Sequence, residues 1–444
     1  MRFLSGPPTI GNVHCVNTIV LEFPHNSVDI TAWCEEERLA GGIDNREHES
    51  DRPHGDMTGP SSPMRPINSI FDVTTPALLL DQSILERNLT RMQDRANELG
   101  VALRPHIKTH KCIEIANHQL ELGARGITAS TLYEVEQFAA AGFNDITWAF
   151  PLIPANIERV LELYEKATIR VVIDSKEVFE RLDSIERVGS ERVHVWLKVD
   201  CGYHRVGVDP ASTLAEELVH RLGESKNLIF DGILTHSGHA YEAKNRSELL
   251  TYAEQERSVM VEFAERMRAK GYTVPMVSVG STPTMSVVEN LDGINEIRPG
   301  NYAFYDYTQV MIGSCGVADC ALTVLASVVS HQPNARHFVT DAGALALSKD
   351  AGPVHISNDM DMGIIFEDYD RKRLQSHLHM KHLSQEHGKV VYSNPEGVAD
   401  RFKVGDKVRI LEHHSCLTAA NFDHYYVVKG YDIVDRWKIL NGRV

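Results

Sequence analysis

The chain has 444 residues, of which 45 are Lys or Arg and 61 are Asp or Glu, so its formal net charge is −16. This acidic balance argues against a general nucleic-acid binder, which presents a basic face. No apolar run reaches the ~18 residues that a membrane-spanning helix needs. Hydrophobic residues make up 43% of the chain, which is ordinary for a globular protein with a large core. The seven scattered cysteines form no CxxC pair and predict reduced thiols in a cytoplasmic protein.

Residues 1–66 differ in texture from the rest of the chain. The segment 47–66 combines Pro, Gly, Ser and charged residues without apolar periodicity, which is typical of a disordered linker. Two interpretations stay open: a flexible extension, or translation that starts later, at Met57 or Met64. The first residues lack the basic and apolar regions of a secretory signal, and frequent acidic residues disfavour a transit peptide. We expect residues 1–66 to be a disordered extension.

A regular alternation of short β-branched runs and longer amphipathic segments begins at Thr75. The predicted strands are 102–108, 126–130, 146–150, 170–174, 193–200, 230–236, 276–280 and 295–300. The predicted helices between them include 83–99, 131–142, 175–188 and 248–271, whose apolar residues recur at three- and four-residue spacing. Eight strands that alternate with helices are typical of a parallel (β/α)8 barrel, with an open doubly wound sheet as the alternative. We therefore expect an α/β fold with a barrel over residues 67–305.

The pattern changes again after about residue 305. The strand-like segments there are 319–331, 336–343, 389–393, 403–414 and 424–440, with turns at 405–406 and 429–430. Helical periodicity is weak throughout this part of the chain. The sequence therefore predicts a C-terminal β-domain over residues 306–444.

Candidate chemistry lies at the carboxyl ends of the predicted barrel strands, where barrel enzymes place their catalytic groups. Lys108 ends the first strand among histidines and a second lysine, and a neighbouring cation would lower the pKa of its amine and favour Schiff-base formation. The glycine-containing turns 280–284 and 298–302 suit a phosphate held by backbone amides. A Schiff-base lysine and a phosphate cradle in one barrel indicate pyridoxal phosphate.

Several ordered motifs together resemble the D-serine dehydratase / D-threonine aldolase family over roughly residues 70–444. The motifs are TPALLLD (75–81), RPHIKTHK (104–111), GITAST (126–131), DCGYHRVGV (200–208), HSGHAY (236–241), GSTPT (280–284), RPGNYAFYD (298–306) and HSC (414–416). The resemblance implies an alanine-racemase-like, fold-type III pyridoxal-phosphate enzyme that is active as a homodimer. By the same resemblance, Lys108 would bind the cofactor covalently, with Arg205 near its phenolic oxygen and Tyr241 beside its pyridine nitrogen. Four further residues would hold the phosphate, namely Ser281, Thr282, Gly300 and Asn301.

His414 and Cys416 are two residues apart, so on a strand both side chains would face the same side. Imidazole and thiolate are suitable ligands of Zn²⁺, and a site with two protein ligands leaves positions for substrate and water. The family resemblance implies a divalent ion at this pair, and the thiolate favours Zn²⁺ over Mn²⁺ or Mg²⁺. His413 would point to the opposite face.

The resemblance implies a lyase that acts on a small D-β-hydroxy amino acid such as D-serine, D-threonine or D-3-hydroxyaspartate. Lys108 would remove the Cα proton, and the metal would stabilise the departing hydroxide, so that a 2-oxo acid and ammonia form. The alternative is the retro-aldol cleavage of a D-threonine aldolase, which yields glycine and an aldehyde. Cys416, where aldolases more often have Asp, favours dehydration. A non-catalytic pyridoxal-phosphate-binding protein is a more remote alternative.

Overall fold

The computed structural model describes residues 22–23, 26–27, 67–185, 191–394 and 397–442. The chain divides into two units, Met1–Met64 and Arg65–Val444. In the first unit, β1 (Glu22–Phe23) pairs with β2 (Asn26–Ser27). The prediction of a disordered extension otherwise falls on residues outside the described ranges. The following description concerns the second unit.

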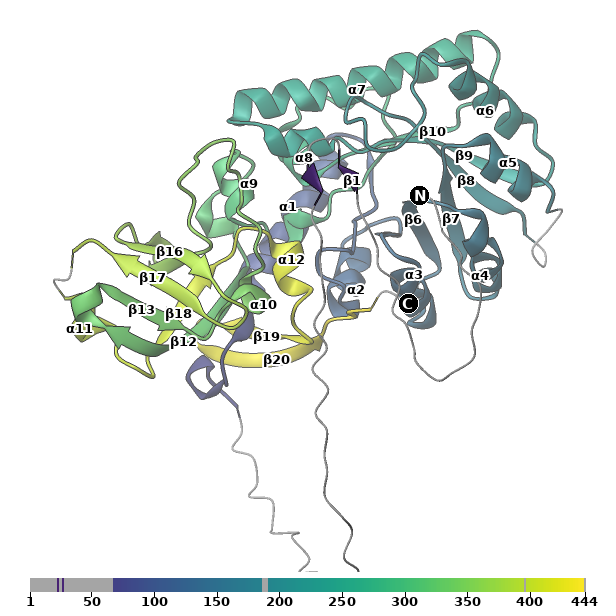
Figure 1. Ribbon diagram of the computed structural model, residues 1–444. Coiled ribbons are helices and arrows are strands. Elements are labelled where there is room, and N and C mark those ends of the chain that lie inside the picture. The colour runs from purple at the N-terminus through teal and green to yellow at the C-terminus, as the bar shows by residue number, and fades with distance from the viewer. Residues whose placement is uncertain (1–21, 24–25, 28–66, 186–190, 395–396, 443–444) are drawn as a thin grey trace, which may run out of the picture. The chain divides into compact units, whose positions relative to one another are not determined.

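The predicted barrel is confirmed (Figure 1). Its eight parallel strands are hydrogen-bonded in the order β4, β11, β10, β9, β8, β7, β6, β5. The sheet closes because residues 105–107 pair with β5: the Ile107 backbone N–H donates to the Thr128 carbonyl at 2.8 Å. The strands are β4 (Ala102–Leu103), β5 (Ile127–Ala129), β6 (Asp145–Pro151), β7 (Thr168–Ile173), β8 (Val193–Lys198), β9 (Leu228–Leu234), β10 (Met276–Val279) and β11 (Glu296–Ile297).

Helices alternate with these strands because each segment has one apolar face, as in α5, where Val178, Phe179 and Leu182 are buried. The α-helices are α1 (Gln82–Glu98), α2 (Ile113–Glu121), α3 (Leu132–Ala140), α4 (Ile157–Glu162), α5 (Lys176–Asp183), α6 (Thr213–Glu224), α7 (Arg246–Ala269), α8 (Thr282–Val287) and α9 (Tyr307–Met311). The short 3-10 helices are η1 (Ile70–Asp72), η2 (Pro154–Asn156), η3 (Leu163–Glu165), η4 (Gly238–Glu242), η5 (Asn301–Ala303), η6 (Val317–Asp319) and η7 (Pro333–Ala335). Within the described ranges, no helix is long and apolar enough to span a membrane.

The interior of the barrel contains a network of buried ion pairs. Arg104, which is fully buried, bonds Glu296 through Nε at 2.8 Å and Asp145 through Nη1 at 2.7 Å. Arg170 extends the network from Asp145 to Asp231, with 2.8 Å for each contact. The network joins four strands, β6, β7, β9 and β11, to the residue that follows β4. Removing one partner would leave an uncompensated buried charge.

A second sheet of ten strands forms the other domain (Figure 1). Its strands are β3 (Ala77–Asp81), β12 (Leu322–Gln332), β13 (His337–Thr340), β14 (Ile364–Asp368), β15 (Arg373–Leu374), β16 (Leu378–Leu383), β17 (Gly388–Tyr392), β18 (Lys407–Leu411), β19 (His424–Lys429) and β20 (Asp432–Lys438). Three short helices accompany them, α10 (Ala344–Leu347), α11 (Val398–Arg401) and α12 (Ser415–Ala419). The strand β3 precedes the barrel in the chain, yet it pairs with β12 and β19. The chain thus starts in the second sheet, forms the barrel and returns.

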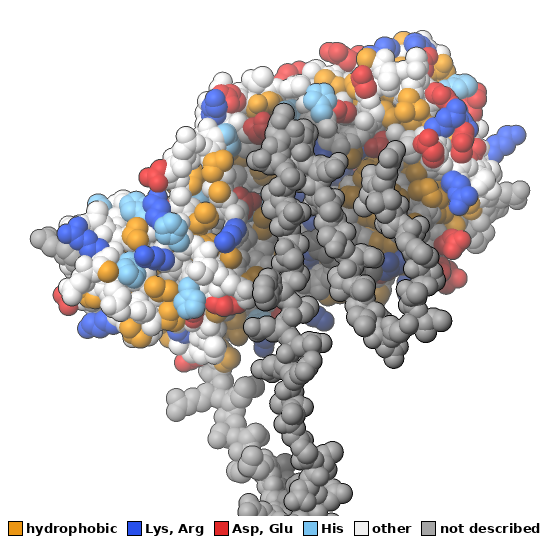
Figure 2. Space-filling view, in the orientation of Figure 1, with side chains coloured by type: hydrophobic (Ala, Val, Ile, Leu, Met, Phe, Trp, Pro, Cys, Tyr) orange, Lys and Arg blue, Asp and Glu red, His pale blue; other side chains and the backbone are white. Residues whose placement is uncertain are grey.

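On the face drawn in Figure 2, acidic and basic side chains of the described residues are interspersed over both the barrel and the second sheet. Side chains of both charge signs are therefore present on this face.

Candidate active site

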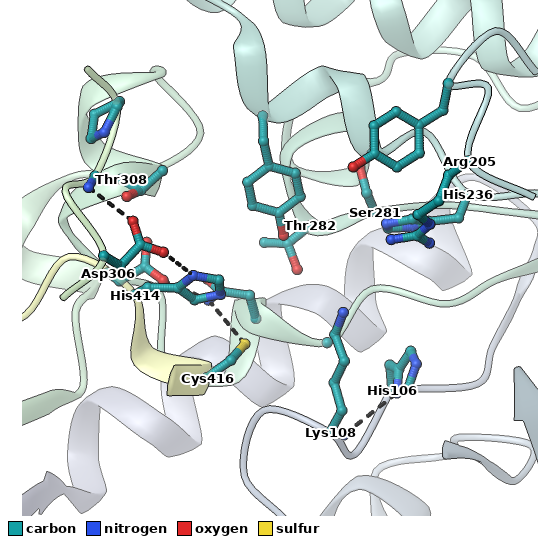
Figure 3. Close-up of a pocket in the computed structure, with 18 of the residues that line it drawn as sticks. His106, Lys108, Arg205, His236, Ser281, Thr282, Asp306, Thr308, His414 and Cys416 are labelled. Atoms are coloured by element: carbon teal, nitrogen blue, oxygen red, sulfur yellow. Dashed lines mark hydrogen bonds and ion pairs between the residues drawn. The ribbon is translucent and has the colours of Figure 1, made fainter. Parts of the chain in front are cut away.

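A cavity of about 330 Å³ opens at the carboxyl ends of the barrel strands and is bounded on its other side by segments of the second domain. All nine residues singled out in the sequence line it: Lys108, Arg205, Tyr241, Ser281, Thr282, Gly300, Asn301, His414 and Cys416. Figure 3 labels Lys108, Arg205, Ser281, Thr282, His414 and Cys416 among them. A neighbouring cavity of about 290 Å³ shares a wall that contains Lys108, Arg205 and Arg298. The barrel motifs and the late HSC motif therefore meet at one place.

Lys108 lies on a turn rather than on a strand. The predicted strand 102–108 is too long, because β4 ends at Leu103 and the chain turns after His106. The side chain of Lys108 nevertheless points into the cavity, beside His106 (Figure 3). Burial and the charge of Lys108 hold the pKa values of His106 and His236 well below the usual range. Both imidazoles are therefore neutral at physiological pH.

The two glycine-containing turns present unsatisfied backbone donors to the cavity. The backbone N–H groups of Thr282, Gly300 and Asn301 have no acceptor among the described residues. Ser281 caps α8, and the Thr282 hydroxyl accepts from the Tyr302 backbone N–H at 3.0 Å. A Cβ at Gly300 would lie 2.6 Å from the His106 carbonyl oxygen, so only glycine fits here without a shift. Three free N–H groups and two hydroxyls form a cradle that suits a phosphate.

A buried carboxyl group holds this cradle in place from behind. Glu256 on α7 accepts hydrogen bonds from the backbone N–H groups of Ser237 and Gly280, each at 3.0 Å, and from the Thr284 hydroxyl at 3.0 Å. Burial raises the pKa of Glu256, although these donors favour its charged form. The side chain ties η4 to the turn that begins α8. The sequence analysis missed it, because Glu256 lies within a long polar helix far from any motif.

Further basic side chains line the two cavities together with Lys108. The guanidinium of Arg205 lies over the Tyr203 ring, 5.0 Å from its centroid. Lys198, at the end of β8, is buried, and burial together with the charges of Arg298 and Arg205 lowers its pKa to about 7. Burial also lowers the pKa of Arg298 to about 10. The sequence analysis did not single out Lys198 or Arg298, although both lie at strand ends. These cations create a field that favours an anion in the cavity.

Tyr241 lies on η4, between the barrel and the second domain. Its phenol lines the cavity, and burial raises its pKa well above the usual range. The hydroxyl lies near Asp306 and Cys416. Tyr241 is therefore a neutral phenol beside the HSC motif.

The predicted strand 403–414 is too long, and neither His414 nor Cys416 lies on a strand. The strand β18 ends at Leu411, and His414 is the extended residue before α12, whose first turn contains Cys416. Both side chains still face the cavity (Figure 3), because the helix begins between them and turns Cys416 back toward His414. His413 is buried and does not line the cavity, so the prediction that it points elsewhere is confirmed.

Several polar groups surround the pair. His414 Nδ1–H donates to Asp350 Oδ2 at 2.8 Å, and Cys416 Sγ lies 3.1 Å from Thr109 Oγ1. Burial disfavours the thiolate of Cys416, but the neighbouring His414 and Lys108 outweigh burial and lower its pKa to about 7. Burial also opposes the charge on His414, whereas Cys416 and Asp350 raise its pKa well above the usual range. Without a metal the pair is therefore an imidazolium beside a thiolate. Once the ring loses its proton, imidazole and thiolate are the donor types that Zn²⁺ prefers.

The side chain of Asn301 bonds the second domain rather than the cradle. Its amide Nδ2 donates to Asp306 Oδ2 at 2.7 Å and to Ser415 Oγ at 2.8 Å. Asn301 can therefore contribute only its backbone N–H to the cradle while its side chain fixes the HSC motif. Among the described residues, no group of three or more His, Cys, Asp or Glu side chains is placed to hold a metal ion.

The chain is similar to several known proteins over most of its length. Residues 80–308 match the family described as alanine racemase, N-terminal domain, and residues 321–428 match the putative serine dehydratase domain. The D-threo-3-hydroxyaspartate dehydratase of Delftia sp. is 36% identical over 379 residues, which are 84% of this chain and 99% of that protein. The D-serine dehydratase of Dictyostelium discoideum is 36% identical and covers 81% of this chain and 95% of its own length. The D-threonine aldolase of an Arthrobacter species is 29% identical and covers 85% of this chain and 95% of its own length.

Solved structures show the same relationship. The Delftia dehydratase superposes with a TM-score of 0.78 and 35% identity, and the match covers 84% of this chain and all of that chain. The alanine racemase of Bacillus anthracis, at 13% identity and a TM-score of 0.60 over 86% of this chain and 100% of its own, shares the fold alone. The chain therefore belongs to the family of D-threo-3-hydroxyaspartate and D-serine dehydratases, lyases with the alanine-racemase-like fold of pyridoxal-phosphate enzymes.

Proposed function

We propose that this protein is a pyridoxal-phosphate- and zinc-dependent lyase that dehydrates a small D-β-hydroxy amino acid to a 2-oxo acid and ammonia. D-Serine, D-threonine and D-3-hydroxyaspartate are the substrate class. The observation that supports this proposal most is that Lys108, the phosphate cradle and the His414–Cys416 pair all line one cavity. The names of the two dehydratases that are 36% identical point to the same chemistry.

The cavity fits pyridoxal phosphate. The free backbone N–H groups of Thr282, Gly300 and Asn301 would hold the phosphate, together with the hydroxyls of Ser281 and Thr282. Lys108 would bind the cofactor covalently, since its amine faces the cavity beside two neutral histidines. When bound, the cofactor supplies the electron-withdrawing system that makes the Cα proton of an amino acid acidic.

The remaining roles fall to residues of this chain. The amine of Lys108 moves the Cα proton. With the cofactor bound, the guanidinium of Arg205 would contact its phenolic oxygen, and the neutral phenol of Tyr241 would lie beside its pyridine nitrogen. The barrel, residues 67–305, holds the cofactor, and the β-domain, residues 306–444, provides the metal ligands.

His414 and Cys416 fit a divalent cation, and their soft thiolate favours Zn²⁺ over Mn²⁺ or Mg²⁺. A bound cation would supply Lewis-acid stabilisation to the hydroxyl that leaves the β-carbon. Structures of the Delftia dehydratase support this assignment. One contains a cysteine-to-alanine variant described as metal-free, and another contains a histidine-to-alanine variant. In that protein the two replaced residues are two positions apart, as His414 and Cys416 are here.

A second candidate reaction is cleavage of the Cα–Cβ bond to glycine and an aldehyde. The observation that supports this reaction is the 29% identity to a D-threonine aldolase over 85% of the chain. The identity to the dehydratases is higher, and Cys416 matches the dehydratase pattern, so dehydration is the first choice.

We further propose a cytoplasmic homodimer. The five described cysteines are free thiols, which supports a reducing compartment. Two large apolar side chains, Phe150 and Ile153, are 56% and 50% exposed beside the second cavity, where a second copy could cover them.

Product identification with D-threonine tests the proposed function, because both lyase reactions consume D-threonine and form different carbonyl compounds. The protein is supplied with pyridoxal phosphate and Zn²⁺ and is assayed with and without a chelator. We expect 2-oxobutanoate and ammonia, with the rate lost when the chelator is present. Glycine and acetaldehyde would instead identify an aldolase. D-Serine and D-3-hydroxyaspartate are assayed in parallel, and no product from any of the three would refute the lyase proposal.

A further inference from the structure

The HSC motif has a third polar partner that the sequence motifs do not contain. Asp350 lies in the segment between α10 and β14, 64 residues before His414 in the chain. Its Oδ2 accepts the His414 Nδ1–H at 2.8 Å, and both residues line the cavity. We propose that Asp350 is a positioning residue for the metal site, which holds His414 so that Nε2 faces a cation shared with Cys416.

The first support is the chemistry of imidazole. A neutral histidine has one N–H donor and one lone pair, and the hydrogen bond at one nitrogen decides which nitrogen keeps the lone pair. Because a carboxylate can only accept, the contact with Asp350 places the proton of His414 on Nδ1. The lone pair is then on Nε2. Metal-binding histidines commonly donate their other N–H to a carboxylate, which fixes both the tautomer and the orientation of the ring.

The second support is that the carboxylate is itself held in place. Asp350 Oδ1 accepts the Gly352 backbone N–H at 2.9 Å, and the Asp350 backbone N–H donates to the Ser348 hydroxyl at 3.2 Å. Gly352 has φ +67°, and a Cβ there would lie 2.1 Å from His413 Nδ1, so the turn requires glycine. The carboxylate therefore has one oxygen for its own loop and one for His414.

The third support is that this loop is anchored to the barrel. His355 Nε2–H donates to the Ala243 carbonyl at 3.0 Å. Ile356 packs against an apolar cluster of the barrel that includes Ala240 and Leu249. The loop thus contacts both the barrel wall and the HSC motif. Because the barrel holds the loop, the hydrogen bond from His414 to Asp350 holds the His414 ring in a fixed place.

The inference rests on the proposed zinc site, and the test separates the two. Full-length protein loaded with pyridoxal phosphate is stripped of metal with a chelator. The Zn²⁺ dissociation constant is then measured by competition with a chromophoric chelator. The variants are Asp350→Ala, Asp350→Asn and, as a matched control, Asp361→Asn. Asp361 forms another carboxylate–histidine pair, with His379 Nδ1 at 3.0 Å, and it does not line the cavity.

Asp350→Ala is expected to weaken Zn²⁺ binding about 10- to 100-fold, as losses of such outer contacts commonly do. Asp350→Asn keeps an oxygen acceptor and is expected to weaken binding less than alanine does. Asp361→Asn should bind Zn²⁺ as the unaltered protein does. With Co²⁺ in place of Zn²⁺, the thiolate-to-metal absorption band should have the same shape in Asp350→Ala at saturation, because the ligands themselves are unchanged.

Unchanged Zn²⁺ affinity in Asp350→Ala would overturn the inference and leave the proposed function intact. A Co²⁺ spectrum of altered shape at saturation would make Asp350 a direct ligand and would overturn the positioning role. If Asp350→Ala does not fold, Asp350→Asn decides, and an affinity equal to that of the unaltered protein counts against the proposal. Failure of the unaltered protein to bind Zn²⁺ would refute the metal part of the proposed function and the inference with it.

Discussion

Replacing Gly300 with alanine perturbs the phosphate cradle without touching any functional group. Gly300 has φ −131° and ψ −49°, and because φ is negative, alanine can adopt this backbone conformation. The added methyl group would lie 2.6 Å from the His106 carbonyl oxygen and 2.9 Å from His106 Cβ. Any effect of Gly300→Ala therefore comes from this contact.

The size of the effect follows from the shortfall in distance. Non-bonded heavy atoms pack at about 3.5 Å or more, so the carbonyl contact is short by about 0.9 Å. The nearest atom belongs to the backbone, so a side-chain rotation cannot relieve the contact, and the cradle or the turn before Lys108 must move. Inserting a methyl group into such a tight site costs about 1–3 kcal/mol. If the movement falls on the cradle, this cost corresponds to about 5- to 140-fold weaker binding of pyridoxal phosphate, at 1.4 kcal/mol for each factor of ten.

The assay is a titration of cofactor-free protein with pyridoxal phosphate, followed by absorbance. Gly316→Ala is the control, since Gly316 also has a negative φ, −105°, and its Cβ would lie 3.8 Å from the nearest atom, Asp319 Oδ2. We expect the control to bind the cofactor as the unaltered protein does. Equal cofactor affinity in Gly300→Ala and Gly316→Ala would refute the placement of the phosphate at Gly300.

Three further results are expected. Borohydride reduction should attach the cofactor to the peptide that contains Lys108, and attachment to another peptide, or persistence in Lys108→Ala, would contradict its assignment. In metal-free protein, alkylation of Cys416 should slow as the pH falls through about 7, because the thiolate is protonated below its lowered pKa. Peptide mass mapping measures the alkylation rate. A midpoint near the ordinary thiol pKa of ~8.5 would contradict the stabilisation of the thiolate by His414 and Lys108. Phe338 is fully buried and stacks on Phe402 with centroids 5.0 Å apart, so Phe338→Ala should lower the free energy of unfolding by about 3–5 kcal/mol in denaturant titrations, and a change below about 1 kcal/mol would show that the site repacks.

Some features of the fold depend on long-range pairing, which local patterns do not specify. The segment 77–81 has an apolar composition that suits a buried strand, but its composition does not determine which strands it pairs with. In the structure Leu79 lies opposite Thr323 on β12 and opposite Tyr426 on β19. The predicted strand 403–414 was too long for a related reason. The apolar pattern continues to Leu411, where β18 ends, and α12 begins at Ser415, which is buried against Asp306 and Asn301 from the other part of the chain.

The sequence by itself determined the alternation of strands and helices, the barrel and the β-domain, because hydrophobic periodicity is a local property of the chain. The nine cavity residues followed from the resemblance of its ordered motifs to a known family. Only the tertiary structure decided which further groups join them. Lys198, Glu256, Arg298 and Asp350 act through burial and through partners that are distant in the chain. Asp350, for example, meets His414 across 64 residues. A charge acquires a shifted pKa or a fixed orientation only when folding removes water and brings its partner within hydrogen-bond distance, so these features appear in the folded protein and not in its sequence.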